Sequence, residues 1–472
     1  MTSIKHDSGQ AEPAIPNGGV SFWYSETGIP AYRAPLPGDR EADVCIVGAG
    51  FTGLWTAYYL KREQPDLRIV ILEKEFAGYG ASGRNGGWLS SELAGSRSAY
   101  ASTHGHQGVV DLLAAMRSAV DEVIEVAQAE NIDADIVKDG LLHVARNRAQ
   151  LGRLQESLQY EKFWGANDDD FVLLTRAELE TRVAVEGSRG ATFSPHCARV
   201  QPAKLVQGLA AAVERMGVSI YEQTTVRRIE PRAAHTDHGI VRAPIVLRCL
   251  EGFTSSIAGE RRTWLPMNSS MIITDPLPES VMSQIGWEGG EVLGDAAHAY
   301  MYAQRTADNR IALGGRGIPY RYGSRTDESG VTQDGTIRAL TELLHGMFPA
   351  AGGVPIAHAW SGVLGVPRDW CATIDIDSET GLGSAGGYVG SGLTTTNLAG
   401  RTLADLVLRR DTELVRLPWV GRRVRRWEPE PLRWLGVQAM YKLYHQADRR
   451  EYEHDLPSTS KIARFANMIT GR

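Results

Sequence analysis

The segment that most constrains the fold lies between residues 42 and 75. A nearly all-apolar run, ADVCIVGAG, ends in glycines, and FTGLWTAYYLKREQPD follows it with helical periodicity until Pro65. A second apolar run, RIVILEKE, comes next. Short apolar runs without alternation are typical of strands that are buried on both faces of a parallel sheet. The segment therefore predicts a strand–helix–strand unit at the start of the globular part of the chain.

The turn in this unit has the spacing of a dinucleotide-binding turn. It reads Gly48-Ala49-Gly50-Phe51-Thr52-Gly53, and Glu73 ends the second strand 20 residues beyond Gly53. Glycines at these positions allow a tight turn, a close approach of pyrophosphate to the backbone and close packing of the helix, whose N-terminus attracts the anion. The Glu73 carboxylate suits ribose hydroxyls and repels a 2′-phosphate, which disfavours NADP. We expect a bound dinucleotide rather than a ligand-free turn.

Two further glycine clusters distinguish between dinucleotides. GYGASGRNGG at residues 78–87 follows the acidic residue directly, and GGYVGSG at residues 386–392 leads into a helix. An NAD domain does not need glycines there, whereas a flavin nucleotide is longer and needs a second close approach to the backbone. Arg84 and Asn85 add donors for phosphate or flavin carbonyls, and the late helix N-terminus suits the anionic side of a reduced flavin. The pattern favours FAD; flexible loops are the alternative.

Composition excludes several classes of protein. The chain has 472 residues, of which 43% are hydrophobic and 22% charged, so it is not disordered, fibrous or a coiled coil. A net charge of −6 gives no basic field for nucleic acid. No apolar run approaches the roughly 18 residues of a spanning helix, and the first residues lack a secretory signal. Four widely spaced cysteines indicate reduced thiols in a cytoplasmic protein without a zinc site.

The order of elements predicts an interrupted nucleotide-binding domain. Helices are expected at residues 108–131, 202–216 and 332–347, and strands at 264–275 and within 300–314. We expect an N-terminal arm (1–40) that docks through its aromatic cluster, Phe22 to Tyr24. We then expect an FAD-binding domain (41–100, 190–262 and 355–410), a substrate domain (101–189 and 263–354) and a C-terminal tail (411–472).

These motifs resemble those of a known family. DVCIVGAGFTGLWTAYYL, IVILEKEFAGYGASGRNGG and AGGYVGSGLTTTNLAGRTLADLVL look like the D-amino-acid oxidase/sarcosine oxidase-like FAD-dependent oxidoreductases, nearest the gamma-glutamylputrescine oxidase-like amine-oxidising branch. The resemblance covers roughly residues 40–410. It implies an α/β fold (α+β overall), with a doubly wound FAD-binding domain of discontinuous segments and an inserted substrate domain built on an antiparallel sheet.

The resemblance also implies a set of cofactor-binding residues along the three glycine clusters and nearby strands. They are Gly48, Ala49, Gly50, Phe51, Thr52, Gly53, Glu73, Lys74, Gly80, Ala81, Ser82, Arg84, Asn85, Gly86, Gly87, Trp88, Val226, Gly362, Gly387, Tyr388, Gly390, Gly392, Leu393 and Thr394. Some relatives attach FAD to a cysteine or histidine, but the cluster at 78–87 holds neither and the spacing of Cys371 does not match. We expect noncovalent FAD.

Oxidation of an amine requires a free amine held against the flavin, so shape matters more than a catalytic triad. Aromatic faces suit an amine or a cationic tail, although core packing is the alternative for each ring. The aromatic candidates are Trp88, Tyr300, Tyr302, Tyr320, Trp360 and Tyr388; Arg316 and Arg368 can bind a carboxylate or form structural salt bridges. Among isolated histidines (His104, His106, His298 and His358) we single out His298, which precedes a candidate strand. The catalytic candidates are His298, Tyr300, Trp360, Arg316 and Tyr388.

We therefore expect an enzyme that oxidises the C–N bond of a primary or secondary amine or amino acid by hydride transfer to FAD. The resulting imine hydrolyses, and O2 is reduced to H2O2. Sarcosine oxidases carry a lysine near the flavin that LPMNSSMIITDPL lacks, so a dehydrogenase with a quinone or protein acceptor is the alternative. A flavin-dependent RNA-modifying protein and a non-catalytic flavoprotein rank lower. The Arg- and Trp-rich tail is expected to pack on the FAD domain rather than bind a membrane surface.

Overall fold

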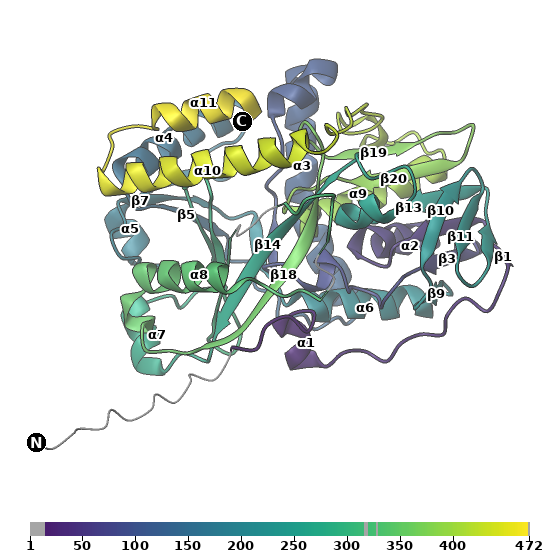
Figure 1. Cartoon of the computed structure of the whole chain (residues 1–472), viewed down its shortest axis with the longest axis horizontal. Helices are drawn as coiled ribbons and strands as arrows, with labels where there is room; N and C mark the ends of the chain where they lie inside the picture. Colours follow the sequence, from purple (N-terminus) through teal and green to yellow (C-terminus); the bar gives the residue numbers. More distant parts are fainter. Residues whose placement is uncertain (1–14, 316–319, 327–328, 471–472) are drawn as a thin grey trace, which may run out of the picture.

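The computed structural model describes residues 15–315, 320–326 and 329–470. A six-stranded sheet carries the turn that begins at Gly48 (Figure 1). Its strand order is β19 (Thr373–Ile376), β20 (Leu382–Gly386), β13 (Ile245–Arg248), β2 (Val44–Val47), β3 (Ile69–Leu72) and β9 (Ser219–Tyr221). All neighbouring pairs are parallel except β19 with β20. Below, this is called the nucleotide sheet.

Both faces of the nucleotide sheet are covered, which explains its unbroken apolar strands. One face packs against the helices α2 (Phe51–Glu63), α3 (Arg97–Ala129), α6 (Pro202–Arg215) and α9 (Gly392–Val407). The other face packs against a small sheet of β1 (Arg40–Glu41), β12 (Ile240–Arg242), β11 (Ala233–Thr236) and β10 (Val226–Glu230). Side chains alternate accordingly, with Ile46 in the helix-side core and Cys45 in the core beneath the small sheet.

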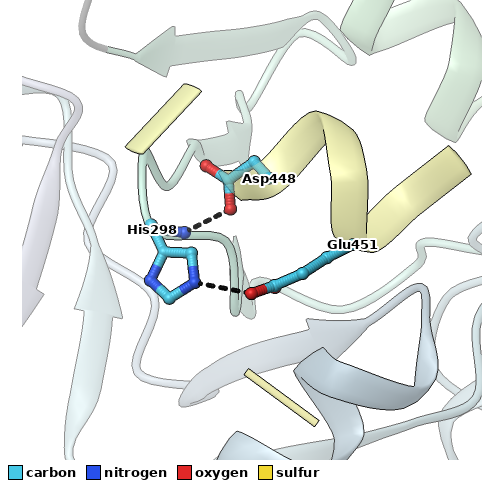
Figure 2. Close-up of side chains that lie close together, drawn as sticks. All are labelled: His298, Asp448 and Glu451. Carbon is cyan, nitrogen blue, oxygen red and sulfur yellow. Dashed lines mark hydrogen bonds and ion pairs between the residues drawn. The ribbon is translucent and has the colours of Figure 1, made fainter. Parts of the chain in front are cut away.

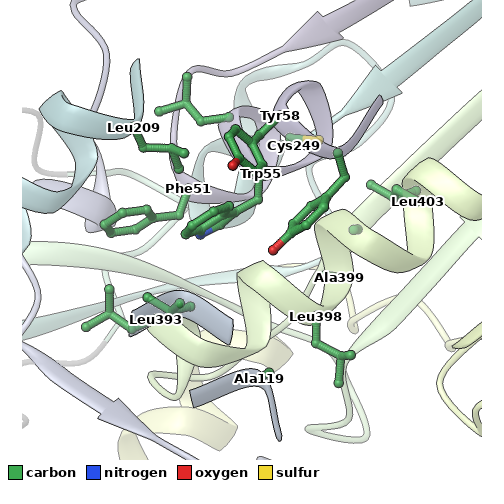
Figure 3. Packing of buried hydrophobic residues seen from close by; sticks show 14 of the residues in the cluster. Phe51, Trp55, Tyr58, Ala119, Leu209, Cys249, Leu393, Leu398, Ala399 and Leu403 are labelled. Atoms are coloured by element: carbon green, nitrogen blue, oxygen red, sulfur yellow. The ribbon is translucent and has the colours of Figure 1, made fainter. Parts of the chain in front are cut away.

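Helices α2 and α9 cross at close range in the main core, where Trp55, Leu398 and Leu403 are fully buried (Figure 3). A Cβ atom at Gly400 would lie 2.6 Å from the Cβ of Trp55, so this crossing requires glycine. Because α9 begins at the third glycine cluster and α2 at the first, their packing fixes the two clusters relative to each other.

A mixed eight-stranded sheet forms the second half of the molecule. Its order is β18 (Ile356–Val366), β14 (Leu265–Thr274), β17 (Ile311–Gly315), β16 (Tyr302–Arg305), β15 (Val292–Asp295), β5 (Leu141–Ala145), β7 (Gly190–Ser194) and β6 (Val172–Thr175). Only β15 with β5 is parallel among these pairs. Helices α5 (Arg176–Glu180), α7 (Glu279–Ile285) and α8 (Asp334–Met347) cover one face and bury a second core. The predicted mixed α/β architecture, with this largely antiparallel second sheet, is confirmed.

Short elements complete the chain. A two-stranded ribbon joins β4 (Trp88–Ser90) to β8 (Cys197–Arg199), and α4 (Arg148–Phe163) packs on β5 and β7. The predicted aromatic docking of the N-terminal arm is confirmed, because α1 (Phe22–Thr27) buries Trp23 and Tyr24. All four cysteines are unpaired, as predicted, and the structure buries each of them. No helix in the described ranges is both long and apolar enough to cross a membrane.

The structure differs from two expectations, one about the helix at 108–131 and one about the packing of the C-terminal tail. The helix expected at 108–131 begins earlier, because α3 starts at Arg97 and continues through a non-helical Gly105. The C-terminal segment packs on the FAD domain only in part. Trp419 is buried beside the nucleotide sheet, whereas the helix α10 (Leu432–Glu453) begins directly after Pro431. Helix α10 packs against α11 (Lys461–Thr470) and is joined to α4 by the ion pair of Arg153 with Glu451 (Figure 1).

Candidate active site

A cavity of about 380 Å³ lies between the carboxyl ends of β2, β3 and β13 and the large sheet. It opens on the sheet face opposite the second core: along β16, Tyr302 lines the cavity whereas Ala303 packs in that core. Ligands of open parallel sheets bind at the carboxyl ends of the strands. The cavity therefore connects the carboxyl-end edge of the nucleotide sheet to the face of the large sheet that points away from the second core.

The first glycine cluster forms one wall. Gly48 has φ +106°, and a Cβ there would lie 2.6 Å from the carbonyl oxygen of Cys249. A Cβ at Gly53 would lie 2.1 Å from the carbonyl oxygen of Gly48, so both positions require glycine. The N–H of Phe51, at the start of α2, donates to Ser82 Oγ at 2.9 Å, which joins the first cluster to the second.

Glu73 stands at the opposite side of this turn. Its Oε2 accepts a hydrogen bond of 2.9 Å from the N–H of Ala49, and its Oε1 accepts one of 3.0 Å from the N–H of Glu75. Burial raises the pKa of Glu73 above its ordinary value. Lys74, Val226 and Arg227 line the same end of the cavity. A carboxylate anchored to the turn, with further acceptor capacity, suits the hydroxyls of an adenosine ribose.

The second glycine cluster follows the cavity toward the large sheet. The guanidinium of Arg84 donates to the carbonyl oxygens of Tyr79 (2.8 Å) and Ser361 (3.2 Å), and it lies over the Tyr79 ring. The side-chain amide of Asn85 donates to the carbonyls of Ala81 and Ser82. Arg84 and Asn85 line the cavity, but these donors hold the loop in shape, whereas we expected them to face phosphate or flavin carbonyls.

A buried acid that sequence reasoning missed holds the third cluster. Glu251 follows β13, and its carboxylate accepts from the N–H groups of Gly387 (2.8 Å) and Tyr388 (3.1 Å). Burial raises the pKa of Glu251 to about 7 from the ordinary 4.5, although the hydrogen bonds act to lower it. The Tyr388 hydroxyl lies 3.1 Å from Thr52 Oγ1, so this loop also contacts α2. The available signal was an acid three residues beyond a buried strand.

Aromatic rings and hydroxyls form the far end of the cavity, on the large sheet. The Tyr302 hydroxyl is 2.8 Å from Ser269 Oγ, and the Trp88 indole N–H donates to the carbonyl of Ala303 at 3.1 Å. The rings of Trp88 and Tyr302 meet edge to face, with centroids 6.0 Å apart. Tyr300 also lines this end. Glu92, another residue that sequence reasoning missed, is the acid at this wall.

The structure brings most of the predicted residues to one cavity. The cavity is lined by Gly48, Gly50, Phe51, Thr52, Glu73, Lys74, Gly80, Ala81, Ser82, Arg84, Asn85, Gly86, Trp88, Val226, Tyr300, Gly362, Tyr388, Gly390, Gly392 and Leu393. Ala49, Gly53, Gly87, Gly387, Thr394, Trp360 and His298 are not part of the lining. Arg316 lies outside the described residues.

Trp360 supports the site from behind. It is fully buried, packs edge to face on Trp23 and donates its indole N–H to the carbonyl of Arg84 at 2.8 Å. Its catalytic assignment has no support in this geometry, because the ring packs in the core formed with α1. Tyr320 is likewise buried away from the cavity, with its hydroxyl bonded to Glu430 at 2.5 Å.

His298 also lies outside the cavity, held by α10 (Figure 2). Its ring nitrogen Nε2 is 3.1 Å from Glu451 Oε1, and its backbone N–H donates to Asp448 at 2.8 Å. Arg153 Nη1 is 3.2 Å from the same ring nitrogen and 2.7 Å from Glu451. His298 therefore anchors α10, and its position gives no support to its place among the catalytic candidates.

These three side chains, His298, Asp448 and Glu451, are close enough together to hold a metal ion. However, the guanidinium of Arg153 already neutralises Glu451, and the Asp448 carboxylate accepts from the N–H groups of His298 and Ala299. The arrangement is therefore an internal ion and hydrogen-bond network, and we assign no metal to it.

For three other candidate residues, the structure shows contacts that support a structural role. Arg368 pairs with Glu428 at 3.1 Å and lies over the Trp427 ring, as expected for a structural salt bridge. His358 Nε2 is 2.8 Å from the carbonyl oxygen of Gly18, and His106 stacks on Trp164. None of these residues lines the cavity.

The residues of the cavity fit FAD. An acid that suits ribose, a glycine turn at a helix N-terminus and a second glycine loop lie in sequence along one continuous wall. Glu73 and Val226 would hold the adenosine part, the turn from Gly48 to Gly53 the pyrophosphate, and the clusters at 78–87 and 386–392 the ribityl chain and ring.

Comparisons with known proteins agree with this site. The family model "FAD dependent oxidoreductase" (DAO) matches residues 43–406. Gamma-glutamylputrescine oxidoreductase of Escherichia coli (strain K12) is 30% identical over 377 residues, which cover 79% of this chain and 84% of that protein. Glycine oxidase of Geobacillus kaustophilus is 24% identical over 383 residues, 78% of this chain and 94% of that protein.

Solved structures share the fold. The crystal structure of the Geobacillus kaustophilus glycine oxidase superposes with a TM-score of 0.65 at 21% identity and covers 81% of this chain and 99% of that chain. L-proline dehydrogenase from P. horikoshii superposes with a TM-score of 0.67 at 18% identity, covering 80% and 96%.

Proposed function

Since this chain belongs to the DAO family of FAD-dependent oxidoreductases, acting on amines or amino acids, we propose that it oxidises the C–N bond of a primary or secondary amine or amino acid to an imine. Water then hydrolyses the imine to a carbonyl compound and ammonia or a smaller amine. The observation that carries this proposal is the single cavity that joins the Glu73 end to the aromatic wall of Trp88, Tyr300 and Tyr302.

Bound FAD supplies the acceptor for the hydride that leaves the substrate carbon. The chain's own residues then have three tasks. Tyr388 and the third glycine cluster, held by Glu251, would form the wall beside the flavin ring. Trp88 and Tyr302 form an aromatic face that suits an amine and excludes water from it. Ser269 and Tyr302, linked at 2.8 Å, offer hydroxyls that orient the bound nitrogen.

We propose that the FAD-binding domain comprises residues 41–100, 190–262 and 355–410, and the substrate domain 101–189 and 263–354. All six strands of the nucleotide sheet come from the first group. Strands β7 and β18 also fall in that group by number but pair in the large sheet, so the chain crosses between sheets within those segments. The four unpaired cysteines support a cytoplasmic location for the reaction.

Two kinds of electron acceptor are compared for the reoxidation of the flavin. We favour O2, which takes two electrons and two protons to give H2O2. A specific observation supports the alternative, a quinone or protein acceptor: Ser269 on β14 lines the cavity, and β14 contains no lysine that would favour reaction with oxygen. The charge balance of −6 gives no support to an RNA substrate.

The test is anaerobic mixing of the purified holoenzyme with a panel of amines and amino acids, followed by the visible absorbance of the flavin. Bleaching by members of the panel supports the proposal. Admission of air then separates the acceptors, because an oxidase recovers its colour with a stoichiometric yield of H2O2. A flavin that no amine or amino acid bleaches contradicts the proposal.

A further inference from the structure

The end of the cavity opposite Glu73 contains an acid, Glu92, that lines two cavities. Strand β4 alternates, so that Trp88 and Ser90 line the cavity and Leu89 is fully buried behind them. Glu92, two residues further, lines the same cavity and also a neighbouring cavity of about 60 Å³. It therefore stands where the two cavities meet, and its side chain is 46% exposed.

The other acids around the smaller cavity have close partners. Glu161 is 2.5 Å from Arg97. Asp170 is 2.8 Å from His196 and 3.7 Å from Arg117. The carboxylate of Glu92, in contrast, faces only His143 among the described basic side chains within ion-pair distance, and at 3.7 Å that contact is longer than a hydrogen bond. Glu92 thus retains its capacity to accept hydrogen bonds from a ligand.

Cationic side chains along the main cavity lie elsewhere. Among its described lining residues, the lysines and arginines are Lys74, Arg84 and Arg227. Lys74 and Arg227 flank the adenosine end beside Glu73 and Val226, and the Arg84 guanidinium donates to two backbone carbonyls. At the far end, the Glu92 carboxylate lies 3.7 Å from His143, whose ring centroid is 6.3 Å from that of Trp88. A carboxylate and aromatic rings on one wall are a combination that attracts a cation.

We propose that Glu92 is a specificity residue that binds a second ammonium group of the substrate, so that the enzyme prefers diamines and their derivatives to monoamines. This inference rests on the proposed function, because it places the first nitrogen of the same substrate at the flavin. Glu92 would accept hydrogen bonds from the distal ammonium through a charge-assisted contact, while Trp88 and Tyr302 flank the carbon chain.

The test compares putrescine with butylamine, which has the same carbon chain but lacks the second nitrogen. Half-saturation of anaerobic flavin reduction, or of the change in flavin absorbance on binding where no reduction occurs, is measured for wild type, Glu92→Gln and the control Glu125→Gln. Glu125 is exposed on α3 and lines neither cavity. All three proteins are first matched for FAD content and unfolding temperature.

We expect wild type and Glu125→Gln to bind putrescine about tenfold more tightly than butylamine. In Glu92→Gln, the affinity for putrescine should fall to the level of that for butylamine, whereas the affinity for butylamine should not change. The limiting rate of flavin reduction at saturation should stay within about twofold of wild type. The preference should also fall as salt is raised. Equal affinities in wild type, or a preference that survives in Glu92→Gln, would overturn the assignment. Selective binding without any flavin reduction would instead count against the proposed function alone.

Discussion

The carboxylate of Glu251 accepts a hydrogen bond of 2.8 Å from the backbone N–H of Gly387, across 136 residues of sequence. This contact links the segment after β13 to the third glycine cluster, which forms the part of the cavity wall where α9 begins. Glu251 lines the cavity itself, which makes its protonation relevant to both stability and cofactor binding.

This carboxyl should make stability depend on pH. Burial raises its pKa in the folded protein to about 7, above the ordinary 4.5. The folded state therefore binds the proton more tightly, and the contribution is fully present below about pH 4.5 and is lost as pH rises through about 7. Relative to Glu251→Gln, wild type should lose up to about 3 kcal/mol of stability across this window. Unfolding temperatures at pH 5, 6, 7 and 8 measure the difference; parallel curves would contradict the assignment.

Glu73 should be needed to retain FAD. Glu73→Gln removes the charge that we assign to the ribose hydroxyls, and a hydrogen bond to a charged group contributes about 1.5–3 kcal/mol. The Kd for FAD should therefore rise about 10- to 100-fold, while the apoprotein remains folded. Fluorescence titration of the apoprotein measures this. Glu41→Gln, exposed on β1, is the control, and an unchanged Kd in Glu73→Gln would remove the residue from the site.

Acid should release intact FAD from the polypeptide. Within the described lining of the cavity, Cys249 is the only cysteine and no histidine is present. The Cys249 thiol is buried, which raises its pKa to about 12 and disfavours the reactive thiolate. The denatured chain should therefore have the mass of the unmodified sequence, in wild type and in Cys249→Ala alike. A flavin-sized increment that disappears in Cys249→Ala would show covalent attachment.

The anchor of the C-terminal helix should stabilise the protein without the pH dependence of Glu251. Burial alone would raise the pKa of Glu451, but hydrogen bonds from His298 and Ser460 and the charge of Arg153 lower it to about 2. Its contribution is present above about pH 4.5 and is lost only as pH falls through about 2. Glu451→Gln should cost about 1–3 kcal/mol, and the penalty should be present at both pH 5 and pH 8. Urea unfolding at both values measures it; a penalty that vanishes at pH 5 would be inconsistent with this anchor.

The sequence predicted the parts of the molecule that local patterns determine. The strand–turn–helix from Val44 to Glu63 and the glycine clusters are visible because each needs a particular residue type at a particular spacing, as Gly53 shows by lying against Gly48. The acid Glu73 was found by its distance from the turn. Together with the family resemblance, these local patterns predicted about half of the residues that line the cavity.

Contacts between distant segments could not be predicted in the same way. His298 precedes a candidate strand, so it looked like a site residue, yet its partner Asp448 is 150 positions away. Nothing local distinguishes an anchor for α10 from a base. Glu251 and Glu92 were missed because each is a single acid. The role of each depends on which wall of the cavity its side chain faces, and contacts between distant segments determine that.

The last prediction concerns the pH dependence of the reaction. Hydride loss needs a neutral amine, whereas a free aliphatic amine is almost wholly protonated near neutral pH. The titratable side chains at the ring and substrate end of the described lining are Glu92, Glu251, Tyr300, Tyr302 and Tyr388, and His298 is held by Glu451 and Arg153 instead. We therefore expect exclusion of water from the nitrogen held at the flavin to lower the pKa of that amine, whereas a distal ammonium at Glu92 stays charged.

The rate of anaerobic flavin reduction at saturating amine should then rise with pH through one ionisation, below that of the free amine. Because this ionisation belongs to the bound substrate, it should persist in His298→Gln once FAD content is matched, and it should move when amines of different basicity are compared. Loss of the pH dependence in His298→Gln would mean that a histidine base operates through a rearranged loop. Its loss in Glu251→Gln would assign the proton to that carboxylate, and either result would contradict desolvation as the cause.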